Sequence, residues 1–155
     1  MAASESRGKR KKYFTVAHAN ATLPLIRAIV KDIVDLTREL QERHDLLSER
    51  HVIDEAHREE LQEVRAAFER DKERLAEYCR ELEDLGIELK DPRTGLIDFP
   101  CWTDNREVYL CWRLGEADVA YWHELDAGFA GRQRLTKDLA DAGRSIVVTP
   151  APRKS

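Results

Sequence analysis

Residues 86–101 read GIELKDPRTGLIDFPC, and this stretch decides the fold because the spacing of the apolar side chains changes within it. Before Gly86 the apolar residues recur every three or four positions, as in a helix, whereas after it they alternate, as in a strand. Gly86 supplies the left-handed stop that ends many helices, and residues 91–95 have the composition of a tight turn. The sequence therefore predicts helices before residue 86 and strands after it.

Two apolar series precede this point, and each has the 3-4 alternation of a helix that packs along another helix. The first predicts a helix at about residues 22–48, with Asn20 or Thr22 as N-cap and Pro24 in the first turn. The second predicts a helix at about residues 54–85. Because each series is about 25 residues long, we expect an antiparallel hairpin rather than one continuous rod. The seam residues are Ile26, Ile29, Ile33, Leu36, Leu40 and Leu47, then Leu61, Val64, Phe68, Leu75, Tyr78, Leu82 and Leu85, with Arg43 and Asp71 in otherwise apolar slots.

Four short strands joined by turns are predicted within residues 87–124, and they make an antiparallel meander. The register that gathers the apolar side chains on one face pairs Leu89 with Ile97 and Ile97 with Trp112. The fold class is therefore α+β, with a long antiparallel helical hairpin packed on a small four-stranded antiparallel β-meander.

The third loop sets the register of the last strand. An even loop pairs Leu110 with His123, which turns His123 toward the helices and Trp122 toward the opposite face. A loop of odd length, or a bulge, would exchange these two side chains.

The composition fits one folded domain with a short tail at each end. The chain has 155 residues, of which 42% are hydrophobic and 36% are charged, and no apolar run is long enough to span a membrane. Residues 1–12 carry five basic side chains and one acidic one, and residues 149–155 contain two prolines. We therefore expect a disordered basic tail over 1–12, a single domain over 13–148 and a disordered tail over 149–155.

The cysteines indicate the compartment. Cys79, Cys101 and Cys111 are odd in number and widely spaced, which argues against a disulfide framework and favours a reducing environment. The first residues also lack the apolar segment of a secretory signal. We expect a cytoplasmic protein.

Recognisable metal and nucleophile motifs are missing from the sequence. His44 and His51 lie seven residues apart in the polar tip of the helices, which separates them by about 10 Å along a helix axis, too far to share one ion. Neither a Cys-x-x-Cys segment nor a pair of Glu-x-x-His segments occurs, and there is no Gly-x-Ser-x-Gly or phosphate loop. We therefore expect no metal and no cofactor, and the sequence leans away from an enzyme without deciding the question.

The distribution of charge bears on the partners. Residues 23–90 hold 12 basic and 19 acidic side chains, so the helices repel a nucleic acid, and weak contact through residues 1–12 is the exception. The long apolar seams also fit a homodimer formed through the helices.

Most of the unusual side chains cluster between residues 98 and 132, where tryptophans stand among paired charges. Such a mixture is typical of a small-ligand pocket or an interaction patch. We assign the candidate ligand-binding site to Asp98, Trp112, Arg113, Glu116, Trp122, His123, Glu124 and Arg132.

Two hypotheses for this cluster belong to different classes. The first is an interaction or small-ligand-binding module that uses the exposed sheet face and the following Gly-rich loop. Its tryptophans act as packing anchors, and its arginines contact a small anionic ligand or an unknown protein. The alternative is a small metal-assisted hydrolytic enzyme with His123 as general base. Taken singly, each residue also has an ordinary structural interpretation, and Cys111 is expected to be a buried, inert thiol rather than a reactive one.

Four phrases in this region, GLIDFP (95–100), EVYLCWRLGE (107–116), YWHE (121–124) and GFAGR (128–132), resemble the motifs of an uncharacterised bacterial family, the domain of unknown function 2203. The resemblance covers about residues 13–135, and the helices match only in pattern. It implies a bacterial cytosolic protein and groups most of the candidate site residues in one motif set. It transfers no catalytic role, because the family has no established activity.

Overall fold

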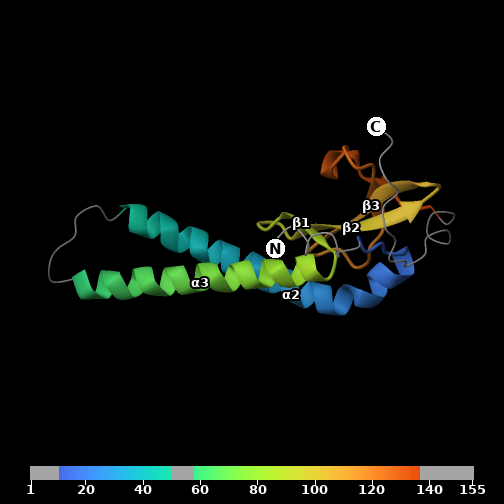
Figure 1. Cartoon of the computed structure of the whole chain (residues 1–155). Coiled ribbons are helices and arrows are strands. Elements are labelled where there is room, and N and C mark those ends of the chain that lie inside the picture. The colour runs from blue at the N-terminus through green and yellow to red at the C-terminus, as the bar shows by residue number, and fades with distance from the viewer. Residues whose placement is uncertain (1–10, 50–57, 137–155) are drawn as a thin grey trace, which may run out of the picture.

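The computed structural model describes residues 11–49 and 58–136, and it places a small sheet over one end of two long helices (Figure 1). Helix α2 spans Val16–Glu49 and helix α3 spans Arg58–Asp84, and they run antiparallel. The strands are β1 (Glu88–Asp91), β2 (Leu96–Thr103), β3 (Arg106–Arg113), β4 (Tyr121–His123) and β5 (Gln133–Arg134), with a short 3-10 helix, η2 (Phe129–Gly131), before β5. The strands pair in chain order, all antiparallel. The α+β class is confirmed, as is the helical hairpin.

The two helices meet along the predicted seams. Ile26 and Ile33 of α2 and Leu82 of α3 are buried where the hairpin underlies the sheet, whereas the far part of the hairpin projects away from it. Arg43 and Asp71, the polar residues in the two seams, form an ion pair with each other. The hydrogen bond from Arg43 lowers the pKa of the Asp71 carboxyl below its ordinary value. The charged positions of the two seams therefore compensate one another across the hairpin.

Helix α2 begins earlier than the predicted residue 22. Thr15, rather than Asn20 or Thr22, acts as the N-cap, because its Oγ1 accepts a hydrogen bond from the backbone N–H of His18 at 2.9 Å. Pro24 lies inside the helix, where its missing N–H leaves the carbonyl of Asn20 without a helical partner. The prediction was wrong here because a proline near a polar residue is the usual signal of a helix start.

The first two hairpins of the sheet have the predicted registers. Leu89 pairs with Ile97, and Ile97 pairs with Trp112. The turn between β2 and β3 consists of Asp104 and Asn105, both with positive φ, as a two-residue hairpin turn requires. The sheet has five strands rather than four, because β5 adds two exposed polar residues to the edge of β4, and so short a segment has no apolar period to reveal it.

The register of β4 differs from the even-loop prediction. Tyr109 pairs with His123 and Leu110 pairs with Trp122, so His123 rather than Trp122 points away from the helices. The cause is the segment 114–120, which is held by helix α2 instead of forming a tight turn. The Asn20 side chain accepts a hydrogen bond from the Val119 N–H at 2.7 Å and donates one to the Val119 carbonyl at 3.4 Å.

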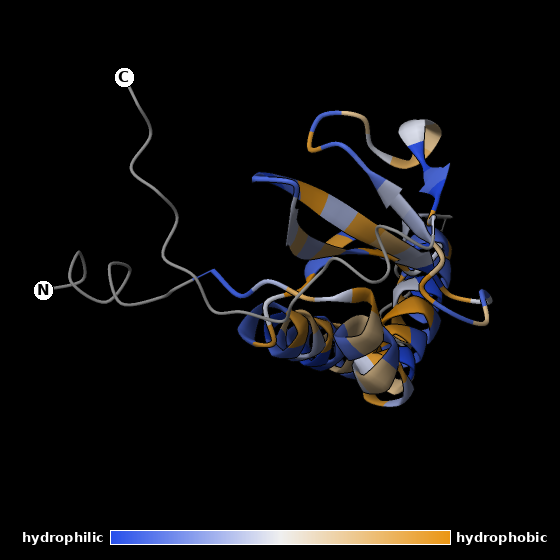
Figure 2. Ribbon diagram, turned by 90° about the vertical axis from the view of Figure 1, so that its right-hand side faces the viewer, coloured by the Kyte–Doolittle hydropathy of each residue, from blue (hydrophilic) through white to orange (hydrophobic). Residues whose placement is uncertain are grey.

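The core lies between the helices and one face of the sheet. Its largest buried side chains include Trp112, Phe99 and Ile97 from the sheet and Phe14 from the segment before α2. The connection between β4 and β5, which contains η2, lies on the other side of the sheet from the helices (Figures 1 and 2). Both faces of the sheet are therefore covered near β4, so side chains on the face away from the helices are also buried there.

Several predictions fall wholly or partly outside the described residues: the tails, the domain boundary after residue 136, and His51 in the helical tip. Lys11 and Lys12, predicted as the end of the basic tail, are placed against the domain, and Lys11 Nζ contacts Glu107 Oε2 at 2.6 Å. Neither α2 nor α3 has a stretch long and apolar enough to cross a bilayer.

Candidate functional site

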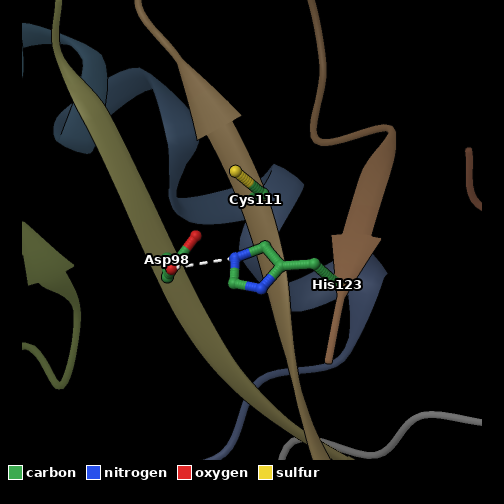
Figure 3. Close-up of side chains that lie close together, drawn as sticks. All are labelled: Asp98, Cys111 and His123. Atoms are coloured by element: carbon green, nitrogen blue, oxygen red, sulfur yellow. Dashed lines mark hydrogen bonds and ion pairs between the residues drawn. The ribbon is translucent and has the colours of Figure 1, made fainter. Parts of the chain in front are cut away.

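Three polar side chains meet on the sheet face that points away from the helices. Asp98 comes from β2, Cys111 from β3 and His123 from β4, so the site spans three neighbouring strands (Figure 3). The side chains of Asp98 and His123 are each only 3% exposed, and Cys111 as a whole is 1% exposed. The face that we predicted to be exposed is therefore buried at its centre.

The hydrogen bonds of His123 fix where its protons lie. Its Nδ1 is 2.7 Å from the backbone oxygen of Glu124, and a carbonyl oxygen only accepts, so Nδ1 carries a proton. Its Nε2 is 3.0 Å from Asp98 Oδ2. An ionised carboxylate also only accepts, so a second proton lies between these two atoms. The pair shares this proton as a buried imidazolium–carboxylate or its neutral equivalent, and neither ring nitrogen is free to act as a general base while both bonds persist.

The remaining oxygen of Asp98 has no such partner. Oδ1 is buried and receives no hydrogen bond from an N–H or O–H donor among the described residues. It lies on the side of the Cys111 thiol, and one ligand-type atom from each of Asp98, Cys111 and His123 lies within 4.8 Å of the other two. A buried carboxylate oxygen next to a weak thiol donor is an unusual arrangement, because most buried polar atoms are hydrogen-bonded.

Burial makes the Cys111 thiol unreactive in this state. Burial first, and the charge of Asp98 second, raise the pKa of Cys111 to about 12, and burial raises the pKa of Cys101 to about 11. Since the thiolate is the nucleophile, we predict that iodoacetamide modifies neither cysteine of the native protein at pH 8. Cys79 is only partly buried and should react first. Peptide mapping by mass spectrometry checks this order, and rapid labelling of Cys111 would contradict it.

The segment after β4 forms the roof of the site. Arg132 holds it in place: its Nη2 contacts Glu116 at 2.6 and 2.9 Å, and its guanidinium lies 4.0 Å from the ring centre of Tyr121 and 4.8 Å from that of Phe129. The guanidinium of Arg113 also lies near the Phe129 ring, 5.0 Å from its centre. Two arginines thus fix one aromatic side chain of the roof.

A cavity of about 220 Å³ lies between this roof and the sheet. Asp98, Tyr109 and His123 line it from the sheet, and Lys90 lines it from β1. Leu96, Leu125, Asp126, Gly128 and Phe129 complete the lining. At about 30 Å³ for each water molecule, the space suits a ligand of a few non-hydrogen atoms.

A larger hollow of about 780 Å³ lies between Lys11 and Lys12, the end of α3 and β1, and it shares Lys90 with the smaller cavity. Its charged side chains reach solvent, and none of the buried unpartnered atoms among the described residues belongs to its lining. We therefore take the smaller cavity as the candidate site, since its polar groups are buried and converge.

The structure separates the predicted site residues into three groups. Asp98 and His123 lie on the cavity floor, and Arg113, Glu116 and Arg132 support the roof. Three others lie away from the cavity: Trp112, Trp122 and Glu124. Trp112 is fully buried among the core residues and donates from Nε1 to the Glu116 carbonyl at 3.0 Å. Trp122 packs against the core, and the Glu124 side chain contacts Arg106 at 2.9 Å.

Sequence reasoning left Lys90, Tyr109 and Phe129 out of the site. The first two stand on the outward side of the predicted strands, so the alternation alone could have drawn attention to them. Burial and the hydrogen bond to Glu88 raise the pKa of the Tyr109 hydroxyl well above its ordinary value. Phe129 lies in a loop, and no local pattern indicates that it covers a cavity.

The fold and the site define the class of this protein: it is an α+β domain with a long helical hairpin and a polar cluster covered by a roof segment. A family model, described as an uncharacterised conserved protein, DUF2203, matches residues 12–135. The chain therefore belongs to this family, as its motifs predicted. No curated protein and no solved structure matches the chain.

Proposed function

We propose that this chain is a small-ligand-binding module whose ligand occupies the cavity between the sheet and the roof. The observation that supports the proposal most is that Asp98, whose Oδ1 receives no N–H or O–H hydrogen bond within the part of the chain that the structure describes, lines the cavity. A binding site of this kind typically combines apolar walls with a few convergent polar groups. Leu96, Leu125 and Phe129 are such walls here.

The polar lining favours a ligand with two different groups. Lys90 supplies a positive charge, although its ammonium also contacts Glu88 at 3.0 Å, and Asp98 Oδ1 has no N–H or O–H donor among the described residues. Asp126 adds a second carboxylate to the lining. A carboxylate near Lys90 and a hydroxyl that donates to Asp98 satisfy both. The proposed ligand is therefore a small hydroxycarboxylate, which refines the anionic ligand expected from the sequence.

A titration followed by nuclear magnetic resonance tests the proposal. In chelator-treated, nitrogen-15-labelled protein, lactate should shift the backbone amide signals of β1, β4 and the roof in a saturable way. Propionate lacks the hydroxyl and lactamide lacks the charge, and both should bind more weakly by about 1 kcal/mol or more, the net value of one hydrogen bond. Equal shifts with all three compounds, or shifts only outside the cavity, would contradict the proposal.

A matched pair of lysine variants locates the charge. Lys90→Gln should weaken lactate binding and remove the preference for lactate over lactamide. Lys72→Gln removes an exposed lysine from the helical hairpin and should leave binding unchanged. If the two variants behave alike, Lys90 does not recognise the ligand.

The expected cytoplasmic location and the expected homodimer remain predictions. The three cysteines are free, which is compatible with a reducing compartment. The hairpin has apolar side chains that reach solvent, among them Leu46 and Val64, which are 57% and 43% exposed. A second copy could cover them, and sedimentation analysis at several concentrations would detect it.

A further inference from the structure

We propose that Asp98, Cys111 and His123 form a binding site for a divalent transition-metal ion, with Zn²⁺ as the natural occupant. Carboxylate, thiolate and imidazole are the three kinds of zinc ligand in proteins, and three protein ligands are the usual number where the fourth position stays open. The inference goes beyond the proposed ligand binding and does not depend on it.

The orientation of His123 is the first argument. The bond from Nδ1 to the Glu124 carbonyl leaves the Nε2 lone pair directed at Asp98 Oδ2, 3.0 Å away. Two acceptor atoms this close need a cation between them, which is either a proton or a metal ion. Histidines that bind metals characteristically donate their other ring N–H to a backbone carbonyl or carboxylate, as His123 does here.

The distances are the second argument. Zinc-ligand bond lengths of about 2.0–2.3 Å place tetrahedral ligands about 3.3–3.6 Å apart. Nε2 and Oδ2 are already close to this separation, and the Cys111 sulfur lies within 4.8 Å of one carboxylate oxygen of Asp98 and one ring nitrogen of His123. The limit of 4.8 Å is longer than the tetrahedral separation, so the Cys111 side chain would move closer to the other two when the site is complete. Asp98 and His123 border the cavity, so an ion can reach them from that side.

The chemistry of the donors selects the ion. A sulfur and an imidazole nitrogen favour zinc and its neighbours over magnesium or calcium, which prefer oxygen ligands. Oδ1 of Asp98 receives no N–H or O–H hydrogen bond among the described residues and lies on the side of the Cys111 thiol, which is a further sign of an absent partner between these side chains, and Asp98 and His123 both line the cavity. The fourth ligand would then lie in the cavity.

Cobalt(II) is the spectroscopic probe for the test, because it takes the zinc position and absorbs light. Full-length protein freed of metal by a chelator should bind one cobalt ion and show visible bands of tetrahedral cobalt and a near-ultraviolet sulfur-to-cobalt band. Zinc should erase both. No spectrum, or an octahedral one without the sulfur band, overturns the proposal.

Four variants assign the ligands. Cys111→Ser should abolish the sulfur-to-cobalt band, whereas the matched control Cys79→Ser should keep it. Asp98→Asn and His123→Gln should weaken binding by more than the roughly 10–100-fold that loss of an outer-shell partner causes. A sulfur band that survives in Cys111→Ser, or that disappears in Cys79→Ser, overturns the assignment.

One measurement avoids the risk that a variant fails to fold. X-ray absorption by the zinc-loaded wild-type protein should show one sulfur and otherwise nitrogen and oxygen neighbours at the metal, and a shell without sulfur overturns the proposal. These experiments contain no hydroxycarboxylate, and the lactate titration contains no free metal. Failure of one proposal is therefore distinguishable from failure of the other.

Discussion

Replacing Asp98 or His123 by alanine is expected to lower the free energy of unfolding by about 3–5 kcal/mol, because either change leaves the other polar group buried without its partner. The two side chains are each 3% exposed and share one hydrogen bond of 3.0 Å. The double variant should be only slightly less stable than either single one, because each single substitution already removes the interaction between the two side chains. Urea unfolding of chelator-treated protein measures all three differences.

The two single variants and the double variant form a double-mutant cycle, which measures the interaction energy between Asp98 and His123. A coupling energy of about 3 kcal/mol or more, close to the cost of one single variant, is expected, at or above the upper end of the range for residues in one network. Asp35→Ala is the control: that carboxylate contacts Lys31 at 2.6 Å but is 36% exposed, and the change should cost less than about 1 kcal/mol. If the effects of Asp98→Ala and His123→Ala simply add, the buried pair does not exist as described.

Gly95→Ala is expected to destabilise the protein by about 2–5 kcal/mol, the sum of a backbone and a packing penalty. Gly95 has φ +74° at the turn between β1 and β2. A Cβ there would lie 2.8 Å from Leu114 Cβ and 2.8 Å from Val30 Cγ1, so the turn could no longer pack against α2. Thermal and urea unfolding check the size of the loss.

Gly115→Ala separates the two penalties. Gly115 also has positive φ, +105°, but an added Cβ would have no heavy atom within 4 Å. Its substitution should therefore cost only the backbone share, about 1–2 kcal/mol. Equal losses for both glycines would mean that the close contact between the turn and α2 is absent.

The sequence predicted the parts of the fold that local patterns control. Helical and strand periods located both helices and four strands, and burial on one face fixed the registers of the first two hairpins. The ion pair between Arg43 and Asp71 joins two positions that the sequence marked as gaps, although nothing in either helix alone shows that the gaps meet. Which residues of the two helices face each other depends on the number of residues that connect the helices, and the local sequence pattern does not determine that number.

The site was predicted less well because it depends on one contact between residues far apart in the chain. Asn20 holds Val119 in place of a tight turn, and the register of β4 follows from that contact. A change of one residue in register moves His123 from the core to the second face, beside Asp98. The sequence marked both residues as candidates, but it could not show that a two-residue strand and a loop would bury them.

The register of β4 is the central claim, because the buried pair, the cavity and the proposed metal site all depend on it. Nuclear Overhauser measurements on the full-length protein test it directly. The structure predicts contacts from the His123 ring to the Tyr109 ring, whose centres are 5.4 Å apart, and a backbone pairing of Tyr109 with His123. Pairing of Leu110 with His123, together with contacts from the His123 ring to helix α2, would contradict the account.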